Sequence, residues 1–215
     1  MSRGDDESGD ADMPGIIQLP RDWSKLVDAV VHACQADSAA PRRLVVLLDG
    51  GSGAGKTTLG HRLRRTLTAR LGVPGGVQLV SLDDCYPGWY GLAQASEWVW
   101  QTVLASDNPG YPTWDWQHNR TSGWVPLDPL RPIIVEGCGA LTRRSAPLAT
   151  SRLWYDMPAS DRKRRALRRQ GGKEFRPWWD AWAAQEQALW AVNRPWELAD
   201  WIVRGDAEGK ARGGS

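Results

Sequence analysis

The chain has few cysteines and no long apolar run, and each shortage argues against a class of protein. Its three cysteines, Cys34, Cys85 and Cys138, are far apart and form no C-x-x-C pair. This spacing points to neither a disulfide framework nor a zinc site. No apolar stretch is close to the length of a membrane-spanning helix, which needs about 18 residues. The acidic N-terminus is unlike a signal peptide. We therefore expect a soluble cytoplasmic protein with no membrane partner.

Net charge is also small, and phenylalanine is almost missing. The formal charge is only +2 over 215 residues, which argues against nucleic acid as the main partner. One Phe stands against 14 Trp. Because Trp supplies a large apolar area with one polar N–H group, we expect most of these rings in the core or lining a cleft.

The length predicts one domain with a small lid. Five acids and one arginine occupy the first 15 residues, so residues 1–18 are expected to form a disordered acidic tail. Residues 205–215 are rich in glycine and polar residues and are expected to be a flexible C-terminus. The folded domain then spans residues 19–204.

The most informative segment is LVVLLDGGSGAGKTT, residues 44–58. Its apolar start is typical of a buried parallel strand, and the rest fits G-x-x-x-x-G-K-[ST], a phosphate-binding loop. Glycines let the backbone approach an anion, and backbone N–H groups with the following helix N-terminus hold phosphate oxygens. Lys56 would reach the β- and γ-phosphates, and the Thr57 hydroxyl would bind Mg²⁺. The predicted nucleotide-binding residues are Gly50, Gly51, Ser52, Gly53, Ala54, Gly55, Lys56, Thr57 and Thr58.

Apolar runs and amphipathic segments alternate along the chain. We expect strands at residues 44–48, 77–82, 132–136, 152–156 and 199–203, and helices at 22–37, 56–71, 92–105, 160–170 and 178–192. This alternation predicts an α/β fold of the P-loop NTPase type, with a five-stranded parallel sheet and helices on both faces. Ligands of such sheets bind beyond the carboxyl ends of the strands, where Asp83, Asp84, Glu136 and Asp156 are expected.

Acidic residues follow the second and third predicted strands. Of Asp83 and Asp84, one could take the proton of an attacking hydroxyl while the other orients the substrate or a metal-bound water. The alternative is that both cap a turn. Glu136 could hold a water on Mg²⁺, or it could be a solvated residue at a strand end.

Residues 107–128 form an excursion dense in Pro, Gly, Asn and Trp. Its centre supplies rings for stacking, and Asp115 or Arg120 could hold hydroxyl groups, as a pocket for a planar hydroxylated ligand requires. Alternatively, Trp114 and Trp116 seal the core. His118 has no partner at metal-ligand spacing and is not expected to bind a metal.

Residues 161–173 contain seven Lys or Arg and one Asp. They could be a solvated helix face or a nucleic-acid-binding arm. Phosphoryl transfer, however, needs cations to neutralise charge on the moving group. We therefore favour an arginine-rich lid over residues 160–175, with Gly171 and Gly172 as a hinge.

These features in their order resemble the P-loop kinases of the uridine kinase, phosphoribulokinase and pantothenate kinase group. The chain most resembles the small "uridine kinase family" ATP-binding proteins of actinobacteria. The segments that carry the resemblance are GGSGAGKTT at 50–58, the D-x-x-[YH] pattern at 83–86 within a DDCYPGW segment, the W-D-W-x-x-x-R stretch at 114–120, VEG at 135–137 and the arginine-rich lid. Two departures from the uridine kinase pattern are Trp114 in place of Tyr and an interval from Asp115 to His118 that is one residue shorter.

The resemblance implies roles for individual residues. Asp83 would be the general base, and Glu136 would support Mg²⁺. The acceptor pocket would be lined by Tyr86, Asp115, Trp116, His118 and Arg120, with Asp84 and Trp114 beside them. The lid candidates are Arg162, Arg165 and Arg169.

The resulting hypothesis is a kinase that uses ATP and Mg²⁺ to phosphorylate a hydroxyl of a nucleoside or nucleoside-like metabolite. One alternative is a phosphotransferase for an antibiotic or other specialised metabolite, and another is a nucleotide-binding ATPase or switch. The chain has no N-K-x-D segment and no D-x-x-G after the third strand, which argues against a GTPase switch. The sequence leaves a homo-oligomer open and does not distinguish ATP from GTP.

Overall fold

The computed structural model describes residues 13–35, 43–169 and 171–205. Residues 1–12 of the expected tail and 206–215 of the expected C-terminus lie outside these ranges. So do the last two residues of the first predicted helix and Gln170 at the end of the lid helix.

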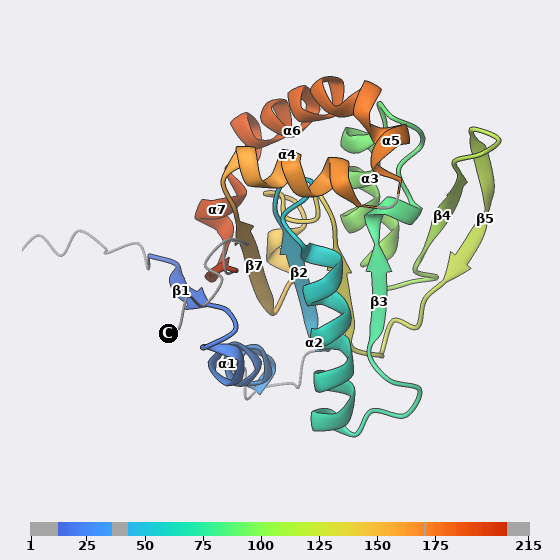
Figure 1. The fold of residues 1–215 in the computed structure, drawn as a ribbon. Helices are drawn as coiled ribbons and strands as arrows, with labels where there is room; N and C mark the ends of the chain where they lie inside the picture. Colours follow the sequence, from blue (N-terminus) through green and yellow to red (C-terminus); the bar gives the residue numbers. More distant parts are fainter. Residues whose placement is uncertain (1–12, 36–42, 170, 206–215) are drawn as a thin grey trace, which may run out of the picture.

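A six-stranded parallel sheet forms the centre of the molecule, in the order β1-β8-β7-β2-β6-β3 (Figure 1). The strands are β1 (Gly15–Gln18), β2 (Val45–Asp49), β3 (Gln78–Ser81), β6 (Ile133–Glu136), β7 (Ser151–Asp156) and β8 (Trp201–Arg204). The α/β fold with helices on both faces is confirmed.

The prediction of five strands was wrong, because β1 is a sixth strand inside the segment expected to be disordered. It has only four residues and follows an acidic stretch, so it carries little local signal. Its backbone pairs with β8, from Gly15 beside Trp201 to Gln18 beside Arg204. Strand β1 therefore forms by pairing with β8, which lies near the other end of the chain.

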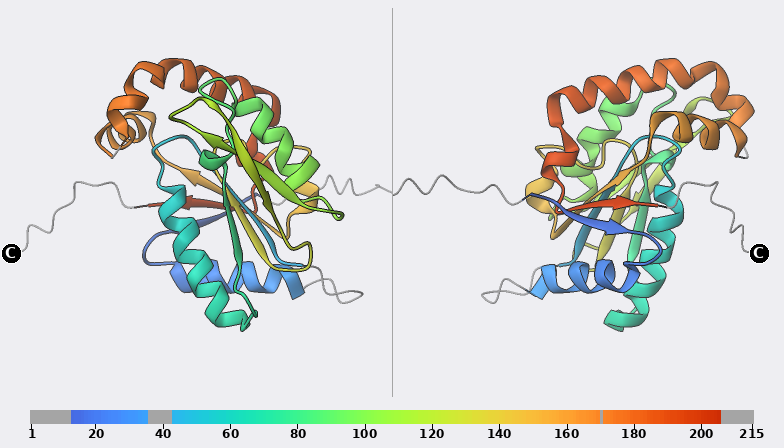
Figure 2. Two further views of the ribbon diagram at one scale, coloured as in Figure 1. Left: turned by 90° about the vertical axis from the view of Figure 1, so that its right-hand side faces the viewer. Right: turned by 60° about the vertical axis from the view of Figure 1, so that its left-hand side comes forward.

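The central strands β2 and β6 are buried on both faces, and alternate residues of β2 face two separate cores. Val46 and Leu48 pack with α1 (Trp23–Gln35) and α2 (Lys56–Leu71), while Val45 and Leu47 pack with the opposite layer. That layer contains α3 (Leu92–Trp98), its π-helical continuation Val99–Val103 and α6 (Trp179–Asn193). Figure 2 shows α1 and α2 on one side of the sheet and α3 on the other.

The excursion expected at residues 107–128 is an antiparallel hairpin of β4 (Gly110–Asp115) and β5 (Arg120–Pro126), which stands beside the β3 edge of the sheet (Figure 1). The lid region consists of α4 (Ala159–Arg168) and α5 (Gly172–Phe175), and a short 3-10 turn at Arg176–Trp178 leads into α6. The remaining short elements are 3-10 turns at Leu82–Asp84 and Ala146–Leu148 and helix α7 (Pro195–Leu198). Helix α4 lies above the end of β2 (Figure 1).

None of the helices within the described ranges combines the length and hydrophobicity needed to cross a lipid bilayer.

Candidate active site

The phosphate-binding loop joins β2 to α2, which begins at Lys56. Gly53 and Gly55 have φ angles of +84° and +105°, which side chains with a Cβ atom rarely adopt. A Cβ atom on Gly53 would also overlap the carbonyl oxygen of Arg162 in α4. Glycine at this position therefore allows both the turn of the loop and the close approach of the lid helix.

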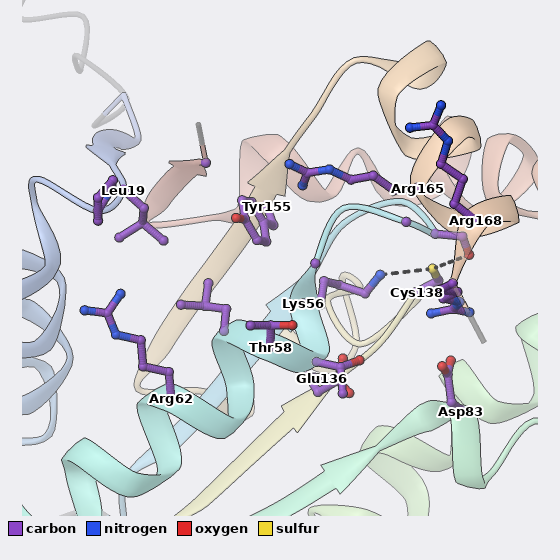
Figure 3. Close-up of a pocket in the computed structure, with 18 residues that line it drawn as sticks. Leu19, Lys56, Thr58, Arg62, Asp83, Glu136, Cys138, Tyr155, Arg165 and Arg168 are labelled. Carbon is purple, nitrogen blue, oxygen red and sulfur yellow. Dashed lines mark hydrogen bonds between the residues drawn. The ribbon is translucent and has the colours of Figure 1, made fainter. Parts of the chain in front are cut away.

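The side chain of Lys56 lies within the loop and is only 7% exposed. Its Nζ donates hydrogen bonds to the carbonyl oxygens of Gly50 at 2.8 Å and Gly51 at 3.2 Å, and it lies 3.4 Å from the Sγ of Cys138 (Figure 3). Burial alone would lower the pKa of Lys56. The surrounding Cys138 and the nearby acidic side chains outweigh that effect and raise the pKa above its ordinary value. The amine is thus held as a cation beside the loop.

Asp49 ends β2 and is fully buried. Its carboxylate accepts backbone N–H groups from Gly50 at 2.6 Å, Gly139 at 3.1 Å and Leu141 at 2.8 Å. Burial raises its pKa to about 7, although these hydrogen bonds act in the opposite direction. Asp49 thereby connects the start of the phosphate loop to the loop after β6. Sequence reasoning did not single it out, because an acid between a strand and a glycine also suits an ordinary turn.

Glu136 lies at the end of β6 and is 1% exposed. The Ser81 hydroxyl donates to its Oε1 at 2.6 Å, and the Thr57 hydroxyl interacts with the same carboxylate. Burial is the largest influence on this group and raises its pKa, against the opposing effects of Lys56 and these hydroxyls. The carboxyl end of β6 therefore brings an acid to the first turn of α2.

Oxygen donors are the ligands that Mg²⁺ prefers, so Thr57 and Glu136 fit this ion chemically. In the described part of the chain, no three His, Cys, Asp or Glu residues are grouped closely enough to hold a metal by themselves. A Mg²⁺ ion here would need phosphate oxygens and water as further ligands, as is usual for this ion.

Asp83 and Asp84 lie in a 3-10 turn, Leu82–Asp84, directly after β3. Asp83 lines a large cavity of about 760 Å³ over the phosphate loop and a smaller one of about 330 Å³ beside it. Asp84 lines neither cavity. Burial, followed by the neighbouring Asp83, raises the pKa of Asp84. The two acids thus have different surroundings, and only Asp83 faces both spaces.

The large cavity is lined by six residues of the phosphate-binding loop between Ser52 and Thr58. Figure 3 shows Leu19 and Arg62 at one end and Asp83 at the other, with Lys56, Glu136 and Cys138 between them. The lid contributes Arg165, Arg168 and Arg169 to its wall. Ser52, Asp83 and Arg169 also line the smaller cavity, so these three residues lie where the two spaces meet.

The smaller cavity has a strongly aromatic wall. Its lining consists of Ser52, Asp83, Tyr86, Trp89, Trp116, Arg169, Gly171, Phe175 and Trp182. Trp89 stacks against Phe175 with ring centroids 5.6 Å apart, and it also contacts Trp116 at 4.7 Å. The indole N–H of Trp116 donates to the backbone oxygen of Asp83 at 3.1 Å, which joins the hairpin to the acid.

Only part of the predicted acceptor pocket lines this cavity. Tyr86 and Trp116 do, and the Tyr86 hydroxyl donates to the Cys138 carbonyl at 2.9 Å. Asp115 instead caps the hairpin turn, where it accepts the backbone N–H groups of Gln117 and His118 and pairs with the His118 ring at 2.6 Å. The residues Trp114, Asp115, His118 and Arg120 are not in the lining of either cavity.

The structure adds Trp89, Phe175 and Trp182 to the lining of the smaller cavity. Trp89 belongs to the short YPGW segment, and a residue so near the predicted acids could have been considered. Phe175 ends α5 and Trp182 lies in α6, and their spacing equally suits a helix that packs on the core. Their place in the cavity depends on the way α5 and α6 fold back over the sheet.

Of the three arginines predicted for the lid, Arg162 has different surroundings from Arg165 and Arg169. Arg165 and Arg169 line the large cavity together with Arg168. Arg162 instead donates to the Ser52 carbonyl and to Oε2 of Glu186, each at 3.2 Å. Glu186 is a buried residue of α6 that sequence reasoning did not select, since a single Glu in a helix usually faces solvent.

No family model matches the sequence, and no curated protein does. Among solved structures, one match is described as a possible uridine kinase from Bacillus stearothermophilus, with 22% identity and a TM-score of 0.52 over 83% of this chain and 99% of that one. Another is described as a "putative fructose transport system kinase" from Silicibacter sp. TM1040, with 20% identity and a TM-score of 0.53 over 83% and 97%. The chain thus has the fold of P-loop kinases, as its sequence predicts.

Proposed function

We propose that this protein is a kinase that uses ATP and Mg²⁺ to phosphorylate a hydroxyl of a nucleoside or nucleoside-like metabolite. The observation that carries the proposal is the junction of the two cavities at Ser52, Asp83 and Arg169. One cavity follows a phosphate-binding loop, and the other has a wall suited to a flat ring. A carboxylate and a guanidinium lie between them, where phosphoryl transfer needs a base and a cation.

Each residue has a definite part in this proposal. The loop amides and Lys56 hold the phosphates of the nucleotide, and Thr57 with Glu136 supports the metal ion. Bound Mg²⁺ would neutralise charge on the phosphate oxygens. Asp83 accepts the proton of the acceptor hydroxyl, and Arg169 stabilises the charge of the group in transit.

A second candidate is a phosphotransferase for an antibiotic or another specialised metabolite. It is favoured by the composition of the smaller cavity, where five aromatic residues face three polar ones, Ser52, Asp83 and Arg169. Nucleoside bases carry polar edges that a selective site pairs with hydrogen bonds. An acceptor with an apolar ring would need fewer such partners.

The test is an acceptor screen that measures ADP release and confirms the phosphorylated product by mass spectrometry. The panel contains uridine, cytidine, methyl riboside and phenyl riboside, with Lys56→Ala as the inactive control. Phosphorylation of uridine or cytidine supports the first candidate, and phosphorylation of phenyl riboside alone supports the second. ADP release equal to that of Lys56→Ala with every acceptor would contradict the first candidate, and failure to bind MgATP would contradict both.

A further inference from the structure

We propose that the corner between β1 and α1, together with Arg62 of α2, binds the base of the nucleotide by stacking. This inference rests on the proposed nucleotide-dependent function and adds the position of the base to it. The ligand is the nucleoside part of a nucleoside triphosphate or diphosphate.

The shape of the large cavity determines which end is left for the base. The loop amides and Lys56 fix the phosphates, and Asp83 lies at the acceptor end. The remaining end is lined by Leu19, Pro20, Arg62 and Gly205. A nucleotide whose last phosphate faces Asp83 therefore extends its nucleoside toward this corner.

Arg62 lies over an aromatic ring at this end. Its Cζ lies 3.7 Å from the centroid of the Trp23 ring, at the first residue of α1. A guanidinium is planar and stacks on aromatic rings, and stacking on one face leaves the other available. Because Arg62 also lines the cavity, it can present that second face to a heteroaromatic base.

The rest of the corner is apolar and is held by the sheet. Leu19 is buried, and its N–H donates to the Arg204 carbonyl at 2.8 Å, which continues the pairing of β1 with β8. The Tyr155 ring lies between Gly55 of the phosphate loop and Gly205, since a Cβ atom on either glycine would contact it. Flat and apolar surfaces thus lead from the loop to the corner, as base stacking requires.

The experiment compares ADP with inorganic pyrophosphate by titration calorimetry in the presence of Mg²⁺. The two probes carry the same number of phosphates, and only ADP has a base. Arg62→Lys keeps the charge and removes the planar group, so we expect ADP to bind about tenfold more weakly while pyrophosphate binding changes less than about twofold. Arg70→Lys is the matched control, because Arg70 lies on the same helix in an exposed pair with Asp28 and should leave both affinities unchanged.

Trp23 tests the same idea through a positioning residue. Trp23→Ala removes the ring under Arg62 and should weaken ADP binding selectively, whereas Trp23→Phe retains a ring and should restore most of the affinity. Thermal unfolding of each variant shows that the fold is intact.

Three results would overturn the inference. Arg62→Lys could weaken both probes equally, which would assign Arg62 to the phosphates, or it could leave ADP binding unchanged. Wild-type protein could also bind ADP no more tightly than pyrophosphate, which would remove the base site while the phosphate loop stands. If the wild type binds neither probe, the proposed function fails together with the inference.

Discussion

Glu186 places its carboxylate on the phosphate-binding loop, where Oε1 accepts the backbone N–H of Ser52 at 2.7 Å. The Cys138 thiol donates to the same oxygen at 3.1 Å, and Arg162 binds the other oxygen. Only 1% of Glu186 is exposed. A negative group from α6 is thus buried beside a loop whose amides suit anions, and it links that loop to the lid helix.

Replacement of Glu186 should lower the stability of the protein and raise its affinity for MgATP. Glu186→Gln keeps the size of the side chain but leaves the guanidinium of Arg162 without its charged partner. We expect the free energy of unfolding to fall by about 1 to 3 kcal/mol. MgATP should bind more tightly, because a fixed negative charge leaves the loop. Urea unfolding and calorimetry measure the two effects.

The matched control is Glu197→Gln, which breaks an exposed pair with Arg194 and should change neither quantity appreciably. Unchanged stability in Glu186→Gln would mean that the contact with Arg162 contributes little. Weaker MgATP binding would mean that the carboxylate supports the loop instead of opposing phosphate.

Asp83→Asn should abolish phosphoryl transfer while nucleotide binding survives. An amide cannot accept the proton of the acceptor hydroxyl, and loss of a general base costs about a hundredfold to ten-thousandfold in rate. Turnover with the best acceptor and the dissociation constant of MgATP are the measurements. Asp84→Asn is the comparison, since Asp84 lines neither cavity and should retain most activity. Lost ATP affinity with transfer intact would remove Asp83 from the role of base.

Trp116→Ala should raise the KM for the acceptor with little effect on MgATP affinity. The ring lines the aromatic cavity and binds the backbone of Asp83, and loss of one stacking ring weakens a bound base by about 1 to 3 kcal/mol. Steady-state kinetics with varied acceptor provides the measurement. Trp124→Ala on the same hairpin is the control, because Trp124 is exposed and lines neither cavity. Equal effects of the two substitutions would assign Trp116 to hairpin stability alone.

Asp49 predicts a dependence of stability on pH. Its pKa is raised by burial to about 7 in the folded protein, compared with about 4 in an unfolded chain. The folded state therefore binds the proton more tightly, so this contribution to stability is complete below about pH 4 and is lost as pH rises to about 7. Unfolding by urea at several pH values, for wild type and Asp49→Asn, measures it.

Glu136 is a second buried carboxyl group whose pKa is raised, and it also contributes to the pH dependence. The free energy of unfolding of the wild type is therefore compared with that of Asp49→Asn at each pH. Asp49→Asn replaces one of the two acceptor oxygens with an NH2 donor and should be less stable than the wild type at acidic pH. The difference in the free energy of unfolding should narrow between about pH 4 and 7. A gap that stays constant with pH would show that Asp49 does not titrate in this range.

Sequence reasoning predicted the parts of the site that depend on neighbouring residues. The phosphate loop is one continuous segment in which glycine spacing determines the backbone, and the lid helix has its own charge pattern and a glycine stop at Gly171. Asp83 and Glu136 could be placed together because parallel strands end at a common edge. Local signals were sufficient for each of these features.

The parts that were missed depend on contacts between distant segments. The aromatic cavity combines Trp89 after β3, Trp116 from the hairpin and Trp182 from α6, and helical spacing cannot distinguish a ring that lines a cavity from one that packs in the core. Asp115 was predicted to hold hydroxyl groups of a ligand, and it caps the hairpin turn in the structure. Whether it also contacts a ligand stays a prediction.

The pairing of β1 with β8 has a consequence for biosynthesis. Gly15 is synthesised early and Trp201 late. The edge strand β1 therefore cannot pair with β8 until nearly the whole chain has been synthesised. Contacts of such high sequence separation form slowly. The corner at Leu19 therefore assembles only after β8 has emerged.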